Sequence, residues 1–379
     1  MSYDVPLVRV ALEDDEIEAY LDRLRSGWLT MGPSIQAFED EMKAFLGAQH
    51  VVSVSSGTAG LHLALLACDV GPGDEVVLPA MSFVAAASAV RHVGAAPVFA
   101  DSEGPNAPWL DVDDVERLLG PSTRAVIATH FMGYPAAVER LRALCDERGL
   151  LLVEDCLHAF GATLEGTGRH VGTIGHVGVF SLSSRAQLPL GEGGLVVSDD
   201  ETRAARARSL RSHAMTTVTW DRHRGHHAGY DIVGLGYNFR LDEPRAALGS
   251  EQLRRFPMRL GERRRVAEAY ASRLTGQPGV ELLRGHAMDG CSPYGLAVLL
   301  DDADVRNHVQ ASLASHRIET TRYPLVTHLT AFAASAPGDD AVRAAAAFAG
   351  RHCVLPCWPS LGTETVDRIA SELVGSLGS

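Results

Sequence analysis

Between residues 51 and 198, short runs of apolar and often β-branched residues alternate with stretches in which apolar residues recur every three or four positions. The short runs predict seven strands, at 51–54, 75–78, 96–99, 124–129, 150–153, 177–182 and 195–198. Strands that alternate with helices along the chain are typical of a mostly parallel sheet covered by helices. The pattern therefore predicts an α/β fold with a large central sheet.

Helical patterns flank this region on both sides. Residues 12–26 begin acidic and end basic, which complements a helix dipole, and Ile35, Phe38, Met42 and Phe45 form an apolar stripe over 33–47. A long helix is predicted from Pro244 to about residue 274, linking two lobes. Beyond it we expect strands at 296–300 and 318–321 and helices at 303–314, 340–349 and 364–374. We therefore expect a large domain over 1–250, with an N-terminal helical segment, and a small α+β domain over 251–379.

Composition excludes several classes of function. The net charge of −13 argues against nucleic acid or an anionic membrane as the main partner. No apolar run approaches the roughly 20 residues of a membrane span, and the N-terminus has no signal-peptide pattern, so we expect a cytoplasmic protein. The six cysteines are dispersed without a CxxC pair, which favours neither a disulfide framework nor a metal site.

Lysine is nearly absent from the chain. Of the 34 basic residues only Lys43 is a lysine, so chemistry that needs a primary amine has one candidate side chain. Lys43 falls in the helix over 33–47, close to Asp40 and Glu41. A solvated helix face is the expected place for it.

Polar residues follow several of the predicted strands. Ser56, Gly57 and Thr58 precede a helix, where free backbone N–H groups could hold a phosphate, although an ordinary N-cap explains them equally well. Phe83 could face the crevice, but taken alone it favours the core. Asp155 ends an apolar strand and needs a cationic or hydrogen-bonding partner, which His158 could share. By themselves these two residues fit a ligand site and a satisfied core pair about equally.

A segment rich in histidine and arginine spans residues 216–227. Its spacing matches no common zinc motif, which favours a polar lid or an interface loop.

Six blocks in order and in register resemble those of the DegT/DnrJ/EryC1/StrS family, over almost the whole chain. The blocks are Ser56-Gly57-Thr58-Ala59, residues 79–83, Glu154-Asp155 with His158, Phe180-Ser181, Gly191-Glu192-Gly193-Gly194 and Tyr237-Asn238-Phe239-Arg240. Members of that family are largely pyridoxal-phosphate-dependent aminotransferases that act on nucleotide-linked keto-sugars or keto-cyclitols, in antibiotic or polysaccharide sugar biosynthesis. The resemblance implies the fold-type-I architecture of such enzymes.

The resemblance also implies a role for each matching residue. Asp155 would pair with the pyridine nitrogen of the cofactor, His158 would bind its phenolic oxygen, and Phe83 would stack on the ring. Gly57, Thr58 and Ser181 would hold the phosphate of pyridoxal or pyridoxamine 5′-phosphate. Asn238 would reach that phosphate from a neighbouring subunit, which implies a homodimer with shared active sites.

Ala186 departs from the family pattern. The family has a lysine five residues after the serine of the Phe-Ser pair, and that position here is Ala186. The lysine forms the Schiff base with the cofactor and moves the proton, and neither a methyl group nor the adjacent Arg185 or Gln187 can do so. Two explanations remain open. Ala186 is either a substitution that traps an inactive cofactor adduct, which we favour, or a natural feature of a lysine-less member.

Two function hypotheses follow. The first is a transaminase that uses glutamate or glutamine as amino donor. The second is a protein that binds the cofactor or a sugar adduct without transamination, as a pseudoenzyme, a regulatory partner or a dehydratase-like protein; a histidine at position 186 would favour dehydration and is absent. Thr30, Tyr323 and His328 lie in segments that resemble sugar-binding ones, with domain packing as the alternative for the last two. Arg240 is a candidate partner for the donor carboxylate.

Overall fold

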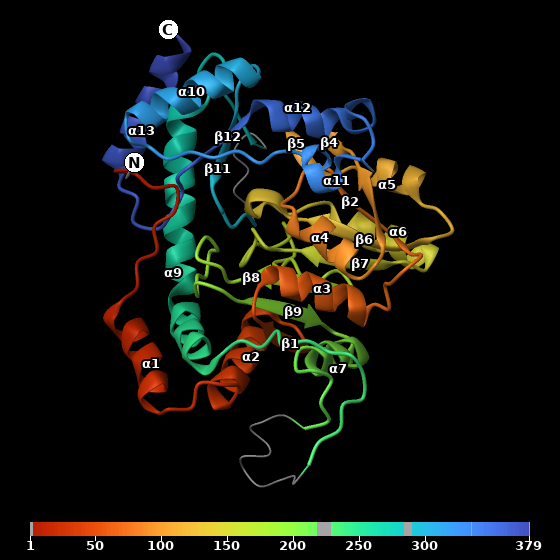
Figure 1. Cartoon of the computed structure of the whole chain (residues 1–379). Coiled ribbons are helices and arrows are strands. Elements are labelled where there is room, and N and C mark those ends of the chain that lie inside the picture. Colours follow the sequence, from red (N-terminus) through yellow and green to blue (C-terminus); the bar gives the residue numbers. More distant parts are fainter. Residues whose placement is uncertain (1–2, 218–228, 284–289, 335, 379) are drawn as a thin grey trace.

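The computed structural model describes residues 3–217, 229–283, 290–334 and 336–378. Its centre is a seven-stranded sheet (Figure 1). In spatial order the strands are β1 (His50–Val54), β9 (Gly194–Ser198), β8 (Val177–Ser181), β7 (Leu151–Asp155), β6 (Thr123–Thr129), β2 (Glu75–Pro79) and β3 (Ala96–Ala100). All neighbouring pairs are parallel except those of β9, which is antiparallel to both β1 and β8. The seven strands predicted from the sequence are confirmed, and so is the mostly parallel sheet.

Alternate side chains of each strand enter different hydrophobic cores. Val52 and Val54 belong to the core beneath α3 (Gly57–Ala67), α4 (Ala85–His92) and α7 (Glu201–Leu210), whereas Val51 belongs to the core beneath α2 (Pro33–Leu46), α5 (Val112–Leu118) and α6 (Val138–Arg148). Both faces of the sheet are therefore covered by helices, as a parallel sheet requires. Its strand ends are left free to carry polar residues.

The C-terminal part of the chain forms a second, three-stranded sheet. It consists of β10 (Glu281–Leu282), β11 (Leu296–Leu299) and β12 (His352–Leu355), all antiparallel. The helices α10 (Ala303–Ser315) and α13 (Thr363–Leu377) share a separate core with it. The remaining short elements are β4 (Ser102–Gly104), β5 (Ala107–Leu110), α11 (Thr330–Ala333) and α12 (Arg343–Arg351), with 3₁₀ turns at Phe131–Gly133, Val326–His328 and Asp339–Val342.

Helix α9 (Glu243–Leu274) connects the two ends (Figure 1). With 32 residues it is about 48 Å long. Asp242 caps it by accepting from the backbone N–H of Arg245 at 3.0 Å. It packs on α1 (Asp14–Arg25) and α2 near its start and on α13 near its end. The predicted linking helix is thus confirmed.

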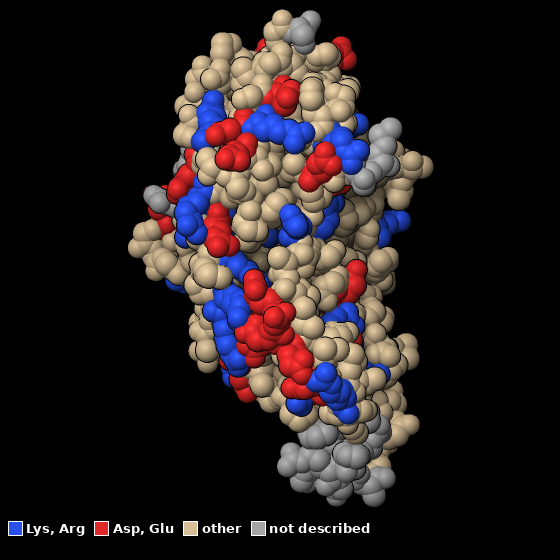
Figure 2. Space-filling view, turned by 90° about the vertical axis from the view of Figure 1, so that its left-hand side faces the viewer, with Lys and Arg blue, Asp and Glu red and all other residues tan. Residues whose placement is uncertain are grey.

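Opposite charges pair where α1 meets α9. Arg255 bonds Asp15 at 2.5 Å, and Arg259 bonds Glu16 at 2.7 Å. Acidic and basic side chains lie side by side over the face drawn in Figure 2. No helix among the described residues combines the length and the apolarity needed to cross a lipid bilayer.

The C-terminal part corrects one prediction. Three of the four residues at 318–321 are β-branched, and the sequence predicts a strand there, but only the ends pair: Ile318 bridges Val5 and Thr321 bridges Val354. Because each end meets a different segment, no ladder forms. β12, which the apolar pattern did not predict, occupies the sheet position instead. Most of the loop at 216–227 lies outside the described residues.

Candidate functional site

A cavity of about 250 Å³ opens where β1, β7 and β8 end. The carboxyl ends of parallel strands meet at one sheet edge, which is where open α/β folds bind ligands. Six of the candidate site residues line it: Gly57, Thr58, Phe83, His158, Ser181 and Tyr323. The structure therefore brings together residues that are up to 266 positions apart, from Gly57 to Tyr323. The other lining residues are Ser56, Leu157, Ser183, Arg185, Glu192 and Tyr294.

One end of the cavity is formed by the start of α3. The hydroxyl of Ser56 caps this helix by accepting from the N–H of Ala59 at 3.1 Å. A side chain on Gly57 would place its Cβ 2.9 Å from Leu157 Cγ and 3.0 Å from Ser181 Cβ. Only glycine leaves the helix terminus open at this point, so an anion can approach its backbone N–H groups. The capping role and the anion role therefore coexist here.

Asp155 lies just beneath the cavity, at the end of β7. It is 2% exposed and accepts two hydrogen bonds, from the N–H of Leu157 at 3.1 Å and from the hydroxyl of Thr129 at 3.2 Å. Burial raises the pKa of this carboxyl to about 6, because these bonds offset only part of the cost of burying the charge. A cation next to Asp155 would restore an ordinary pKa.

His158 lies on the cavity wall and is 7% exposed. Its ring stacks on Tyr294 with 4.1 Å between centroids, and its Nδ1 is buried without a hydrogen-bond partner. Burial and, to a lesser extent, the positive charge of Arg185 together lower the pKa of His158 to about 3, so the imidazole is neutral. A neutral imidazole with a free nitrogen can bind a polar group of a ligand.

The sequence left open whether Phe83 faces the crevice or the core. Its side chain is 47% exposed at the cavity, so the core reading is wrong. Tyr294 also lines the cavity, although the sequence gives no sign of it. It lies between a segment outside the described residues and β11, where no periodic pattern or motif singles it out.

Ala186 is buried, with 1% of its surface exposed. Its neighbours tie it to the cavity: Arg185 lines the wall, and the side-chain amide of Gln187 donates to the carbonyl oxygens of His158 at 2.5 Å and Ser292 at 2.9 Å. The surroundings of the chain's lysine differ from those of Ala186. Lys43 is on α2, its side chain is 40% exposed, and it pairs with Asp40 at 3.7 Å.

Six candidate residues do not line the cavity within one chain: Asp155 and Ala186, described above, and four others. Thr30 lies in the connector between α1 and α2, and His328 is an exposed side chain that pairs with Asp339 at 2.7 Å. Asn238 is bridged to Ser212. Arg240 is close enough to Arg211 that burial and this second cation both lower its pKa.

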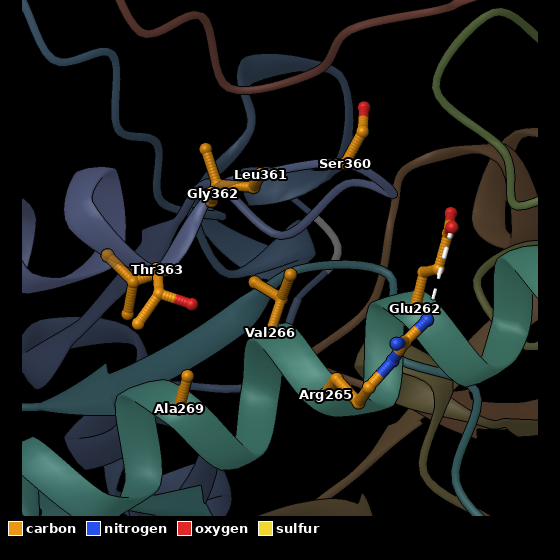
Figure 3. A pocket seen from close by; sticks show the side chains of 9 residues that line it. Glu262, Arg265, Val266, Ala269, Ser360, Leu361, Gly362 and Thr363 are labelled. Carbon is orange, nitrogen blue, oxygen red and sulfur yellow. Dashed lines mark ion pairs between the residues drawn. The ribbon is translucent and has the colours of Figure 1, made fainter.

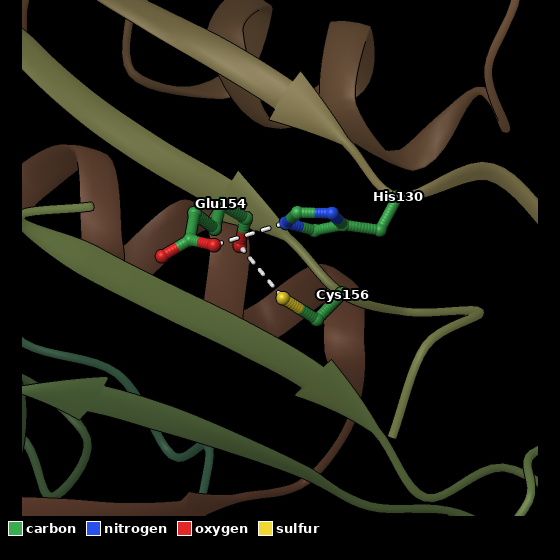
Figure 4. A group of neighbouring side chains, drawn as sticks. All are labelled: His130, Glu154 and Cys156. Carbon is green, nitrogen blue, oxygen red and sulfur yellow. Dashed lines mark hydrogen bonds and ion pairs between the residues drawn. The ribbon is translucent and has the colours of Figure 1, made fainter. Parts of the chain in front are cut away.

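His130, Glu154 and Cys156 form a buried cluster at the ends of β6 and β7 (Figure 4). Glu154 is bonded to His130 at 2.9 Å and accepts from the N–H groups of Gly172 and Ile174, each at 2.8 Å. With its oxygens already occupied, the carboxylate has no free position for a metal. These bonds hold the end of β7 in place.

A second cavity, of about 280 Å³, lies between α9 and the start of α13 (Figure 3). Glu262 and Arg265, which pair at 3.9 Å, form one side of it. None of the candidate site residues lines it. Size alone therefore does not identify the site. The cavity at the ends of β1, β7 and β8 is the one lined by candidate site residues.

Comparison with known proteins finds similarity to aminotransferases. The model of the DegT/DnrJ/EryC1/StrS aminotransferase family matches residues 10–374. A dTDP-4-dehydro-2,3,6-trideoxy-D-glucose 4-aminotransferase of Saccharopolyspora spinosa is 35% identical over 95% of this chain and 94% of that protein. The crystal structure of the aminotransferase TlmJ from Streptoalloteichus hindustanus is 33% identical with a TM-score of 0.89, over 99% of each chain. A putative sugar aminotransferase of Streptococcus pneumoniae in its PLP form is 26% identical with a TM-score of 0.91, over 99% of this chain and 98% of that one.

Proposed function

Since this chain belongs to the DegT/DnrJ/EryC1/StrS aminotransferase family, we propose that its cavity holds pyridoxal or pyridoxamine 5′-phosphate beside a keto-sugar nucleotide or keto-cyclitol. The fold is that of fold-type-I pyridoxal-phosphate aminotransferases, as the TM-score of 0.89 to TlmJ indicates. The family activity is transfer of an amino group, here from glutamate or glutamine. Without a lysine at position 186, this chain binds these ligands and does not complete the transfer.

Three features of the cavity support the cofactor. The open helix start at Gly57 suits a phosphate, with the hydroxyls of Thr58 and Ser181 on the same cavity wall. Asp155 is a buried carboxyl whose raised pKa calls for a cationic partner, which a protonated pyridine nitrogen provides. His158 has a buried Nδ1 that lacks a partner and can meet the phenolic oxygen. The residues present therefore fit the group.

When bound, pyridoxal phosphate supplies an aromatic ring that accepts electrons from a substrate carbon. The chain's own residues orient that ring and tune it. Asp155 keeps a proton on the ring nitrogen, Phe83 offers a flat apolar surface at the cavity, and Ser181 holds the phosphate. The step left without a residue is proton transfer at the substrate carbon, because the methyl group at position 186 can neither donate nor accept a proton.

The observation that carries the proposal is the burial of Ala186 between Arg185, a residue of the cavity wall, and Gln187, which bonds the backbone of another wall residue. Arg185 lines the cavity and Gln187 bonds the backbone of His158, so position 186 is held against the site. A side chain with an amine at this position would enter the cavity. Among the described residues, the lone lysine, Lys43, pairs with Asp40 on another helix.

A homodimer is part of the proposal. Asn238 does not line the cavity of its own chain, as expected of a residue that serves a neighbouring subunit. A mostly apolar cavity of about 440 Å³ lies beside the loop that carries Ala186, lined by Val10, Leu12, Ile17, Leu190 and Leu248 among others. Three of these residues, Val10, Leu12 and Ile17, are 40–44% exposed. Covering such a surface with a second copy would stabilise the assembly.

Replacing Ala186 by lysine tests the function. The Ala186→Lys variant, loaded with pyridoxal phosphate and given glutamate or glutamine, should convert the cofactor to pyridoxamine phosphate in a single turnover. General acid–base catalysis by a placed group is worth roughly 10²–10⁴ in rate, so the gain over the parent chain should be plain. Ser184→Lys is the matched control: it adds a lysine two residues away, at an exposed position, and should not convert the cofactor.

Failure of the lysine variant would favour the second function. If Ala186→Lys folds and binds the cofactor but converts it with no amino acid tested, the missing amine is not the defect. The chain would then be a natural lysine-less member that binds cofactor or sugar without transamination.

A further inference from the structure

Arg185 is a charged residue of the cavity wall without a role in the cofactor site. Within the described part of the chain it forms no ion pair, and the one other charged side chain on the wall is Glu192. The remaining lining residues are neutral, His158 included. A guanidinium with five N–H donors therefore faces a cavity without a bound counter-charge.

Arg185 has different neighbours from the residues at the phosphate end of the cavity. Its electrostatic neighbours are His158, Tyr294 and Tyr323, whose pKa values respond to its charge after the larger effect of burial. The hydroxyls of Tyr294 and Tyr323 hydrogen-bond to each other. Gly57 and Ser181, in contrast, approach each other at the start of α3. Arg185 and the two tyrosines thus form a second polar group of residues, distinct from the phosphate end.

We propose that Arg185 binds the carboxylate of an amino-acid ligand that shares the cavity with the cofactor. The planar guanidinium can bond both carboxylate oxygens at once. Arg185 is also adjacent to position 186, where the reacting amine of the family belongs. This inference rests on the proposed function, because that function places an amino-acid donor in this cavity.

The chemistry of the two substrates decides which anion Arg185 meets. In an amino acid the carboxylate is attached to the same carbon as the amino group, so it must lie beside the reacting position. In a nucleotide-linked sugar the diphosphate is separated from the keto carbon by part of the sugar ring. An arginine next to position 186 therefore suits the carboxylate better than the diphosphate.

Arg240 is the competing candidate. It does not line the cavity, and it lies beside Arg211, another cation. An anion at Arg240 would have to approach from outside this cavity. The geometry favours Arg185 within one chain.

The test measures binding, with no turnover. Glutarate, an unreactive dicarboxylate, is titrated by calorimetry into cofactor-loaded protein and into the Arg185→Gln variant. Loss of a charge-assisted bidentate contact should weaken glutarate binding about 10- to 100-fold. Pyridoxal phosphate affinity, followed by absorbance, should change less than about twofold. Arg343→Gln, which alters an exposed arginine paired with Asp340, should change neither.

Three further arms separate the alternatives. The neutral diamide of glutarate should bind poorly to the parent chain and be insensitive to Arg185→Gln. Uridine diphosphate should bind equally to both proteins, and an effect on it larger than on glutarate would overturn the inference in favour of a diphosphate contact. Weakened pyridoxal phosphate binding in Arg185→Gln, or loss of glutarate binding only in Arg240→Gln, would overturn it as well.

The same measurements distinguish this inference from the proposed function. If the parent chain does not bind pyridoxal phosphate, the proposed function fails whatever Arg185 does. If it binds the cofactor but glutarate affinity is equal in parent and Arg185→Gln, only the role of Arg185 fails.

Discussion

Glu154 and Asp155 are consecutive carboxylates at the end of one strand, and the protein treats them in opposite ways. Glu154 is fully buried and bonds His130 and several backbone N–H groups; burial alone would raise its pKa, but these partners hold the pKa below the ordinary value. Asp155 has two bonds, and burial raises its pKa to about 6. The first site is complete without a ligand, whereas the second lacks a positive partner. An incompletely satisfied buried charge beside a cavity therefore marks a ligand site better than burial itself.

The largest effect on the unfolding free energy is expected at Glu154, whose hydrogen-bond partners are complete without a ligand. Glu154→Gln removes the charge that His130 and the N–H groups of Gly172 and Ile174 share, and breaking a buried pair costs about 3–5 kcal/mol of unfolding free energy. Urea denaturation at neutral pH measures this loss. Glu201→Gln is a matched control, because Glu201 also pairs with a histidine, His50 at 3.0 Å, but its side chain is 70% exposed. That exposed pair should cost less than about 1 kcal/mol, and equal losses at the two sites would contradict the comparison.

Removing the charge of Asp155, which lacks a positive partner, should instead stabilise the cofactor-free protein. In cofactor-free protein, Asp155 contributes stability while it is protonated, and this contribution is lost as pH rises from about 4 through the folded pKa of about 6. Asp155→Asn removes the buried charge yet keeps an oxygen toward Leu157, so it should stabilise the cofactor-free protein at pH 8 by up to about 3 kcal/mol. Melting curves across pH 4–8 measure both effects.

The cost of that substitution should appear in cofactor binding. Without the carboxylate, the ring nitrogen loses its counter-charge, and pyridoxal phosphate affinity should fall at least about tenfold. A variant that is destabilised at pH 8, or that binds the cofactor as well as the parent, would show that Asp155 is a structural residue like Glu154.

The smallest effect on stability is expected at His158. Its pKa of about 3 keeps the ring neutral at physiological pH, and its Nδ1 has no partner to lose. His158→Phe retains the stacking on Tyr294 and should change the unfolding free energy by less than about 1 kcal/mol. The absorption spectrum of bound cofactor should nevertheless shift, because its phenolic oxygen loses a contact. A large loss of stability without a spectral shift would place His158 among the structural residues.

The sequence predicted the large sheet well because its signal is local. Each strand is a short apolar run, and alternate residues such as Val51 and Val52 enter the two cores that the helices cover. Residues 318–321 show the limit: β-branched composition favours a strand, but pairing is decided by partners more than 30 positions away, at Val5 and Val354.

The site was predictable where motifs carry it and not where packing does. Gly57 and Ser181 belong to recognisable blocks and lie together as expected. The exposure of Phe83, the unpartnered Nδ1 of His158 and the stacking of Tyr294 depend on three-dimensional contacts that no spacing encodes. Neither does the sequence reveal that Glu154 and Asp155, side by side in one strand, differ so much in their surroundings.

The role of position 186 is tested most directly by borohydride reduction of the parent chain loaded with pyridoxal phosphate, followed by intact-mass measurement and peptide mapping. We expect the cofactor to be bound, since Gly57, Ser181 and Asp155 are in place, and we expect reduction to attach none of it to the protein. The Ala186→Lys variant treated in the same way should gain one cofactor, mapped to residue 186. Covalent cofactor on Lys43 of the parent chain would contradict both the role assigned to position 186 and the site built around Asp155.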